Sequence, residues 1–278
     1  MPLTHTVPRI AYESEGTSGS PVLLVMGFGM RGMMWQTQSR ELSKTHRVAT
    51  FDHRGLGGSE EGQKGLSMAD MAKDALSVAD ALGFGSMHVV GVSMGGMVAQ
   101  HVALTEMRRV RSLTLIATHP GGRLAWLPPL KGVQCFVRAQ TGPVASRMRA
   151  FEELLYPQAF LDTCDRRELS KRMNNSVGLP APKKTRLSQL RAVFNHDTRA
   201  RLGSLRMPTL IVRPGQDVLI NPRNSDTLAR LLPHAEVMRL EDAGHGVIFQ
   251  SATQLNRRLL DHFAAADRAL GDEREASL

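Results

Sequence analysis

The sequence of 278 residues predicts an α/β fold, with a mostly parallel central sheet flanked by helices. Short runs rich in Val, Leu and Ile alternate with segments of helical periodicity, as in consecutive βαβ units. Most of these runs are apolar without alternation, which is typical of strands buried on both faces. The rhythm stops after Thr118 and resumes at Met207. We therefore expect a helical lid inserted after the sixth strand, with residues 1–118 and 206–278 as the core domain and residues 119–205 as the lid.

The elements expected in the first half follow from local patterns. Apolar runs predict strands at residues 21–26, 46–51, 86–92 and 110–117. Residues 67–82 repeat apolar side chains at helical spacing, Ser67 suits an N-cap and Gly83 is a stop signal. A second helix is expected to open after Ser93 and to cover residues 97–106.

The second half begins with a break. Proline and glycine pairs at residues 120–122 and 128–129 end the α/β rhythm, and residues 130–200 are helical in character. The α/β rhythm then predicts strands at residues 209–213 and 236–240 and helices at residues 223–232 and 248–266. The polar tail from residue 267 onward is expected to be frayed.

The net charge of +9 is concentrated in the expected lid. Residues 119–205 contain 11 Arg and 4 Lys against 3 Asp and 3 Glu, so the rest of the chain is neutral. Three interpretations stay open: a solvated basic surface, a rim that attracts anionic substrates, or a surface that binds an acidic partner. Basic residues are not interleaved with stacking aromatics there, so we expect no nucleic-acid partner.

The composition excludes several other classes of protein. Hydrophobic residues make up 42% and charged residues 22%, as in ordinary globular proteins, which argues against disorder and coiled coils. Cys135 and Cys164 are too few for a disulfide scaffold, so we expect free thiols in a reducing compartment. The longest apolar run is too short to span a bilayer and no secretory signal is evident. These observations predict a cytoplasmic protein, monomeric or homodimeric, without stable membrane insertion.

The motif with the clearest chemical meaning is Gly91-Val92-Ser93-Met94-Gly95. It directly follows a predicted strand and opens a predicted helix, which is the context of a nucleophile elbow. Such a tight turn exposes the serine Oγ at the positive end of a helix, and small residues on either side prevent clashes. Ser93 is therefore the predicted nucleophile.

A serine hydroxyl needs a base, and the base needs an acid to orient it. Asp217 follows one predicted strand and His245 lies after the last one. The chain order Ser93, Asp217, His245 is an order known for such triads. Asp242 is a second candidate for the acid, although it lies on the same loop as the histidine. The histidine spacing matches no zinc motif, so we expect neither a metal nor a cofactor.

With these residues the sequence resembles the α/β-hydrolase fold family from about residue 10 to residue 263. The run from Asp52 to Ser59 resembles the family's Asp-x-Arg-Gly-x-Gly-x-Ser loop, in which we expect Asp52 and Arg54 to pair. The ten residues from Gly91 to Gln100 most resemble serine esterases and enol-lactonases of the 3-oxoadipate type.

The run Met26-Gly27-Phe28-Gly29 resembles the family's His-Gly-x-Gly oxyanion loop, with Met26 in place of the histidine. By this resemblance, the backbone N–H groups of Phe28 and Met94 form the oxyanion hole. Gly27 and Gly29 are then expected at the substrate, and His119, which follows a predicted strand, is a further candidate for substrate contact.

The resemblance and the triad together imply a serine hydrolase that cleaves small carboxylic esters through an acyl-enzyme. Two alternatives stay open. One is a lactonase acting on an anionic enol-lactone, which the basic lid would favour. The other is a receptor or scaffold that binds a ligand on the same fold without hydrolysing it.

Overall fold

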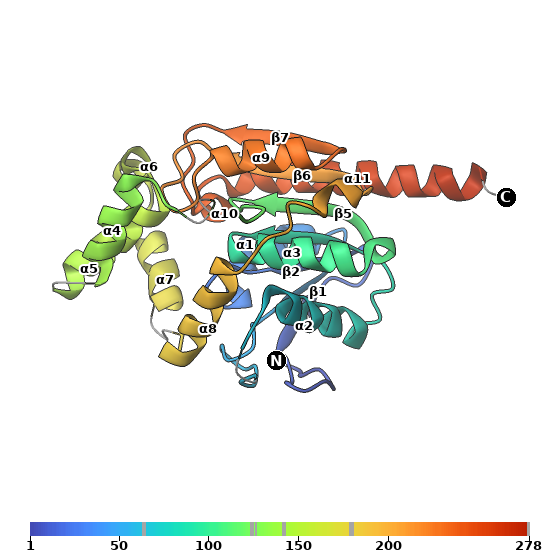
Figure 1. Cartoon of the computed structure of the whole chain (residues 1–278), viewed down its shortest axis with the longest axis horizontal. Coiled ribbons are helices and arrows are strands. Elements are labelled where there is room, and N and C mark those ends of the chain that lie inside the picture. The colour runs from blue at the N-terminus through green and yellow to red at the C-terminus, as the bar shows by residue number, and fades with distance from the viewer. Residues whose placement is uncertain (63–64, 123–124, 126, 141–142, 178–180, 277–278) are drawn as a thin grey trace.

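The structure is a computed structural model that describes the whole chain except residues 63–64, 123–124, 126, 141–142, 178–180 and 277–278 (Figure 1). Its strands form one sheet of seven in the order β1-β3-β2-β4-β5-β6-β7, with β1 antiparallel to β3 and every other pair parallel. The strands are β1 (Tyr12–Glu15), β2 (Pro21–Val25), β3 (Arg47–Phe51), β4 (Met87–Val92), β5 (Val110–Ile116), β6 (Thr209–Pro214) and β7 (Ala235–Leu240). The predicted α/β class with a mostly parallel sheet is confirmed.

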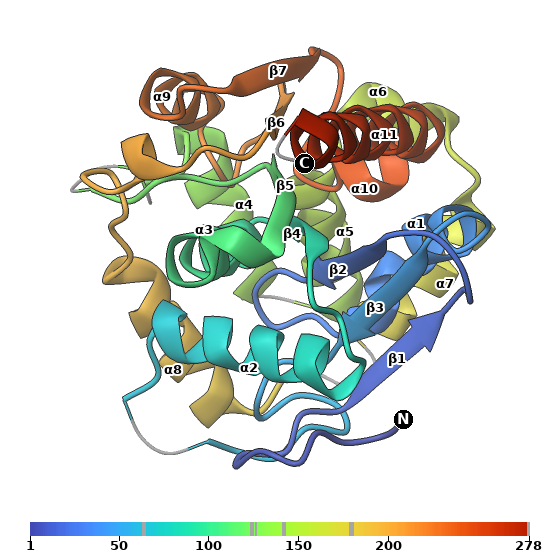
Figure 2. The same ribbon diagram turned by 90° about the vertical axis from the view of Figure 1, so that its right-hand side faces the viewer.

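Helices cover both faces of this sheet (Figure 2). Helices α2, α3 and α9 bury Met71, Val98 and Leu228 against one face, and α1, α10 and α11 cover the other. The helices are α1 (Gln36–Leu42), α2 (Met68–Ala81), α3 (Met94–Thr105), α9 (Arg223–Leu231), α10 (Val247–Gln250) and α11 (Ala252–Ala276), with short 3₁₀ turns at Gly32–Trp35, Met107–Arg109 and Leu202–Ser204. No helix within the described ranges combines the length and the apolar character that a bilayer span requires.

Helix α2 shows how the sequence sets a helix boundary. The Ser67 hydroxyl accepts a hydrogen bond from the backbone N–H of Asp70, and the Asp70 carboxylate accepts one from the backbone N–H of Ser67. This reciprocal capping box satisfies two donors that the first helical turn would leave unpaired. The helix therefore starts directly after the predicted N-cap.

A helical insertion, defined here as residues 119–205, lies between β5 and β6. It contains α4 (Leu130–Gln140), α5 (Val144–Leu155), α6 (Gln158–Thr163), α7 (Arg166–Val177) and α8 (Lys183–Phe194). Helices α4 to α7 gather on one side of the molecule (Figure 1), and Ala192 of α8 belongs to the same buried cluster as α2 and α3. The insertion follows the fifth strand of the sheet, where we expected the sixth. The chain before β1 forms only an isolated bridge between Leu3 and Ala11, and Pro8 in this segment has no N–H for a longer ladder.

The C-terminal segment differs from the expected frayed tail. Helix α11 continues to Ala276, ten residues beyond the predicted end. Asp267 fixes this extension to the sheet, since its carboxylate accepts hydrogen bonds of 2.6 Å from both Ser20 and Arg111. The polar residue at position 267 therefore anchors α11 through an ion pair with Arg111 of β5.

Candidate active site

Ser93 occupies a strained turn between β4 and α3. Its backbone has φ 56° and ψ −123°, a region that L-residues with a Cβ rarely adopt. Two hydrogen bonds fix this conformation: the Ser93 N–H donates to the Ile116 carbonyl at 2.9 Å, and the Thr118 hydroxyl donates to the Ser93 carbonyl at 2.7 Å. The turn leaves the Ser93 side chain partly exposed at the carboxyl end of β4. This is the geometry of a nucleophile elbow.

The glycines around Ser93 are required by close backbone contacts. A Cβ on Gly91 would lie 2.2 Å from the Gly95 carbonyl oxygen, and one on Gly95 would lie 2.1 Å from the Val25 carbonyl oxygen. Real Cβ contacts are never so short, so both positions exclude any side chain. The motif therefore needs glycine at both positions because α3 crosses closely over β2 and β4.

Asp217 and His245 come together at the adjoining end of the sheet. The Asp217 carboxylate is 1% exposed, and its Oδ2 lies 2.7 Å from Nδ1 of His245. Its Oδ1 accepts hydrogen bonds from the N–H groups of Leu219 and Ile220 at 2.8 and 2.9 Å. Because a carboxylate only accepts, Nδ1 of His245 must hold the proton, and Nε2 is left as the basic nitrogen.

The candidate triad thus lies on the loops after β4, β6 and β7. The acid loop and the histidine loop are tied together by a 2.9 Å hydrogen bond from the Gln216 N–H to the Ala243 carbonyl. Between Ser93 and His245, both of which the structure describes, there is no hydrogen bond. Catalytic hydrogen bonds are often long without substrate and tighten when it binds. Asp242, the second candidate acid, is exposed, and its carbonyl accepts a hydrogen bond from Gln250.

The predicted oxyanion loop packs directly on the nucleophile. A Cβ on Gly27 would lie 3.2 Å from the Ser93 Cβ, so this glycine allows the close approach. Within the described chain, the backbone N–H groups of Phe28 and Met94 have no protein acceptor. The Met94 N–H also belongs to the first turn of α3, where such groups point out of the helix. The two donors are therefore available for a developing oxyanion.

His53 braces the oxyanion loop from beneath, which sequence reasoning missed. This fully buried ring donates from Nε2 to the Met26 carbonyl at 2.7 Å. Burial lowers the pKa of His53 to about 4, so the ring is neutral near pH 7. His53 lies in the loop after β3. The only sign of its role in the sequence was its position inside the Asp-x-Arg-Gly motif.

The expected pair between Asp52 and Arg54 is wrong. Arg54 binds Asp74 of α2 in a bidentate pair of 2.6 and 2.7 Å. Both oxygens of Asp52 are used by backbone donors, because they accept from the N–H groups of Gly32 and Gly58 at 2.9 and 3.2 Å. Asp52 shapes its own loop, while Arg54 fixes that loop to α2.

The helical insertion contacts the loop of Asp217, the loop of His245 and the predicted oxyanion loop. A Cβ on Gly132 of α4 would lie 1.7 Å from the Val218 carbonyl oxygen, next to Asp217. The N–H of Gly246, next to His245, donates to the Leu155 carbonyl at 2.7 Å. The Gly29 N–H, in the oxyanion loop, donates to the side chain of Gln189 of α8 at 2.9 Å. The insertion therefore packs over the end of the sheet where the triad candidates lie.

Comparison with known proteins decides the family. A sequence model described as the alpha/beta hydrolase fold matches residues 20–252, which is most of the chain. The chain belongs to the α/β-hydrolase fold family.

Relatives and solved structures of this family match nearly the whole length of the chain. A protein of Variovorax paradoxus, provisionally named carbamate hydrolase RutD, is 33% identical over 263 residues, covering 91% of this chain and 95% of that protein. An enol-lactonase from Burkholderia xenovorans superposes with a TM-score of 0.80 at 22% identity, covering 95% of this chain and all of that one. A thermophilic esterase from Thermogutta terrifontis gives a TM-score of 0.78 at 25% identity, covering 95% and 97%. The protein is a hydrolase of α/β fold.

His119, the expected substrate contact, lies in a buried histidine cluster where this α/β-hydrolase joins its insertion. It is 1% exposed, and its Nδ1 accepts a hydrogen bond from the Gly121 N–H. The His196 ring lies 5.6 Å from the His119 ring and 5.5 Å from the His101 ring, centroid to centroid. No group of metal-ligating side chains among the described residues has the spacing to hold an ion. This placement favours a structural role for His119.

Burial keeps the histidine cluster neutral. Burial lowers the pKa of His119 to about 4, and burial with the nearby histidines lowers that of His196 to about 3. Burial and the charge of Arg201 lower the pKa of His101 to about 4. The ordinary value of 6.5 applies in the unfolded chain, which therefore binds more protons than the folded chain below about pH 6.5.

We expect acid to destabilise the fold through this cluster. The free energy of unfolding should fall as the pH drops from about 6.5 towards 4, by roughly 3 kcal/mol for His119 alone. Urea unfolding at pH 7, 6, 5 and 4 measures this slope. His196→Asn should flatten it by up to about 1.4 kcal/mol per pH unit, whereas His234→Asn, at an exposed position, should not. Equal slopes for the wild type and His196→Asn would contradict the expectation.

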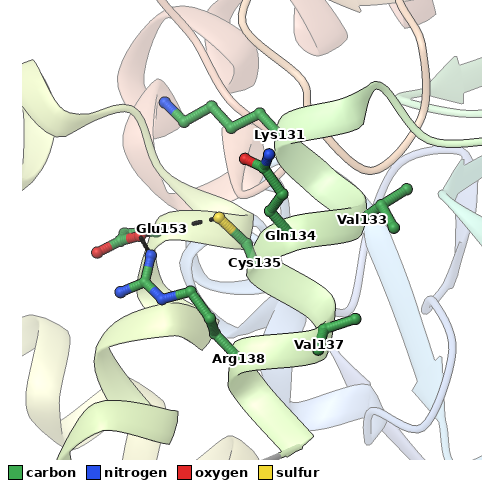
Figure 3. A pocket seen from close by; sticks show the side chains of 7 residues that line it. All are labelled: Lys131, Val133, Gln134, Cys135, Val137, Arg138 and Glu153. Atoms are coloured by element: carbon green, nitrogen blue, oxygen red, sulfur yellow. Dashed lines mark hydrogen bonds and ion pairs between the residues drawn. The ribbon is translucent and has the colours of Figure 1, made fainter.

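A pocket of about 560 Å³ lies within the insertion, between α4 and α5 (Figure 3). Its lining includes Cys135, whose Sγ is 3.8 Å from the Glu153 carboxylate, and Arg138, which pairs with Glu153 at 2.8 Å. Burial and the Glu153 charge raise the pKa of the Cys135 thiol, which disfavours the reactive thiolate. Cys135 and Cys164 are both free, as predicted.

Proposed function

We propose that the protein is a serine hydrolase that cleaves small carboxylic esters through an acyl-enzyme intermediate. The observation on which this depends is the buried Asp217–His245 pair at the sheet edge where the strained elbow exposes Ser93. In this proposal Ser93 Oγ attacks the carbonyl carbon while Nε2 of His245 takes the hydroxyl proton. Asp217 holds the imidazole in the tautomer that leaves Nε2 basic and stabilises the imidazolium.

The tetrahedral intermediate places a negative charge on the former carbonyl oxygen. The unpaired N–H groups of Phe28 and Met94 would hold it, each contributing on the order of 3 kcal/mol. His245 then returns the proton to the leaving alcohol. In the second half of the reaction His245 takes a proton from water, which attacks the acyl-enzyme, and returns that proton to Ser93 Oγ. No step requires a cofactor or a metal ion.

We further propose that the helical insertion, residues 119–205, is a lid that covers this site. Its contacts with the acid, histidine and oxyanion loops support that role. Such a cover limits the space at the acyl pocket, which would select small-molecule substrates. The insertion contains 11 Arg and 4 Lys. Anionic esters and lactones are therefore part of the substrate range to be tested.

A carbamate is a second candidate substrate class. Several relatives that match over 87% or more of this chain are provisionally named carbamate hydrolases. A carbamate presents a carbonyl to the same nucleophile and the same oxyanion donors, so the triad would need no change. A panel of neutral esters, enol-lactones and carbamates, compared by kcat/KM, would rank the classes.

Labelling with a fluorophosphonate probe tests the nucleophile directly. The probe traps serines that are activated by a base, so we expect one adduct on the peptide that contains Ser93, located by mass spectrometry. Pre-incubation with an ester that the protein hydrolyses should slow the labelling. Absence of an adduct would instead favour the non-hydrolytic receptor, and an adduct on another serine would reassign the nucleophile.

A further inference from the structure

The insertion packs against the backbone on both sides of His245. A Cβ on Gly244 would lie 2.6 Å from the Leu155 carbonyl oxygen, and one on Gly246 would lie 2.2 Å from the ring of Tyr156. Leu155 ends α5 and Tyr156 follows it, and the Leu155 carbonyl also accepts the hydrogen bond from the Gly246 N–H. The position of the histidine loop therefore depends on the insertion as well as on the core.

Tyr156 belongs to an aromatic cluster that the core and the insertion share. Its ring is buried, and the ring centroid lies 5.2 Å from that of Phe160 in α6 and 6.2 Å from that of Phe249 in α10. Helix α10 begins at residue 247, so Phe249 and His245 belong to one short segment. The Tyr156 hydroxyl accepts a hydrogen bond from the guanidinium of Arg172 in α7. A displacement of the Tyr156 ring would therefore reach the backbone of the candidate base.

Arg172 connects the two sides of the candidate site through one side chain. Its guanidinium donates a hydrogen bond of 2.9 Å to the Met34 carbonyl, in the 3₁₀ turn that follows the predicted oxyanion loop. Its Cζ also lies 4.8 Å from the centroid of the Phe249 ring, in the segment that follows His245. Burial lowers the pKa of this guanidinium, and a cation in such a place needs acceptors to offset its lost hydration. Arg172 therefore fixes α7 to both the oxyanion side and the histidine side of the site.

The contact with Asp217 fixes one edge of the His245 ring. Asp217 binds Nδ1 at 2.7 Å, whereas Nε2 on the far edge must reach Ser93. A rotation of the imidazole about the Asp217 contact would move Nε2 away from the nucleophile without breaking that contact. A displacement of about 1 Å between reacting atoms can cost about 10²-fold in rate. The backbone of the histidine loop must therefore be held from its other side, where the insertion lies.

We propose that Tyr156 and Arg172 are positioning residues, which hold the histidine loop where Nε2 of His245 reaches Ser93. In this role the insertion completes the catalytic base in addition to covering the site. The inference rests on the hydrolytic function proposed above. Removing either side chain should slow the proton transfers and leave substrate binding almost unchanged, so the loss should appear in kcat and not in KM.

A double-mutant cycle with His245 tests the proposal. Tyr156→Leu removes the ring that faces Gly246, and Arg172→Met removes the charge and its donors. We expect each substitution to lower kcat for p-nitrophenyl butyrate roughly ten-fold, with KM changed less than about twofold. The His245→Ala background has no imidazole to position, so there we expect each substitution to change kcat less than about twofold.

Arg167→Met, at an exposed arginine of the same helix, is the matched control and should leave kcat unchanged in both backgrounds. Arg172→Lys keeps the charge and a donor, so its loss of kcat should be smaller than that of Arg172→Met. Thermal unfolding identifies a variant that does not fold, and the other two then provide the answer. Equal losses of kcat with and without His245, or an effect on KM alone, would overturn the proposal and leave both residues as supports of the insertion.

The two proposals fail in different ways. If His245→Ala retained more than about a tenth of the wild-type kcat, the hydrolytic function proposed for the triad would be wrong. If His245→Ala lost its activity but the substitutions of Tyr156 and Arg172 acted equally in both backgrounds, only the positioning role would be wrong.

Discussion

Replacing Ser93 with alanine is expected to lower kcat/KM for a p-nitrophenyl short-chain ester by at least about 10³-fold. Alanine lacks the Oγ that would form the acyl-enzyme, and no other hydroxyl occupies the elbow turn. The backbone strain at φ 56° remains, because alanine has the same Cβ as serine. The loss should therefore appear in kcat with little change in thermal stability. Residual activity above the rate in water would come from the oxyanion donors and from substrate binding alone.

The control for this variant is Ser18→Ala, which changes an exposed serine in the turn before β2. It should keep wild-type activity. If Ser93→Ala retained more than about a tenth of the wild-type kcat/KM, a covalent Ser93 mechanism would be untenable. A contaminating esterase would give the same activity in both variants, so the difference between Ser93→Ala and Ser18→Ala measures only the rate that depends on Ser93.

The fold was predictable from sequence where one local pattern has one structural solution. Apolar runs located β2, β3, β4, β5 and β6 to within one or two residues, because strands buried on both faces contain few polar residues. β1 (Tyr12–Glu15) was missed, since it is a polar edge strand that pairs on one side only. Its sequence Tyr-Glu-Ser-Glu has no apolar run to find, and the pairing partner β3 lies more than 30 residues away.

The candidate site was predictable where short motifs set backbone geometry. Gly91 and Gly95 indicated the elbow because a tight crossing of chain segments allows no side chain there. The partners contributed by tertiary packing left no such signal. Nothing in the sequence places Gln189 of α8 against Gly29, 160 positions earlier, and the choice of Asp74 over Asp52 as partner of Arg54 depends on where α2 packs.

Asp217→Asn is expected to lower kcat by about 10⁴-fold while the protein stays folded. Leu219 and Ile220 donate their N–H groups to Oδ1 of Asp217, so the asparagine must place its carbonyl oxygen at that position. Its NH₂ group then faces Nδ1 of His245, where Oδ2 accepts a hydrogen bond of 2.7 Å in the wild type. Two donors cannot face each other. The imidazole must shift its proton to Nε2 and present Nδ1 as the acceptor, which removes the base from the side of Ser93.

Stopped-flow or initial-rate assays with the same ester, alongside thermal unfolding, would measure this loss. Asp242→Asn is the matched control, because this exposed carboxylate was the other candidate acid on sequence grounds and lies three residues from His245. It should change kcat less than about threefold, in keeping with an exposed surface residue. The acid would have to be reassigned if Asp242→Asn were the more damaging substitution. A full loss of folding in Asp217→Asn would instead show that the Oδ1 contacts stabilise the loop more than they orient the base, and Asp217→Glu, which keeps an acceptor for His245, would then separate the two roles.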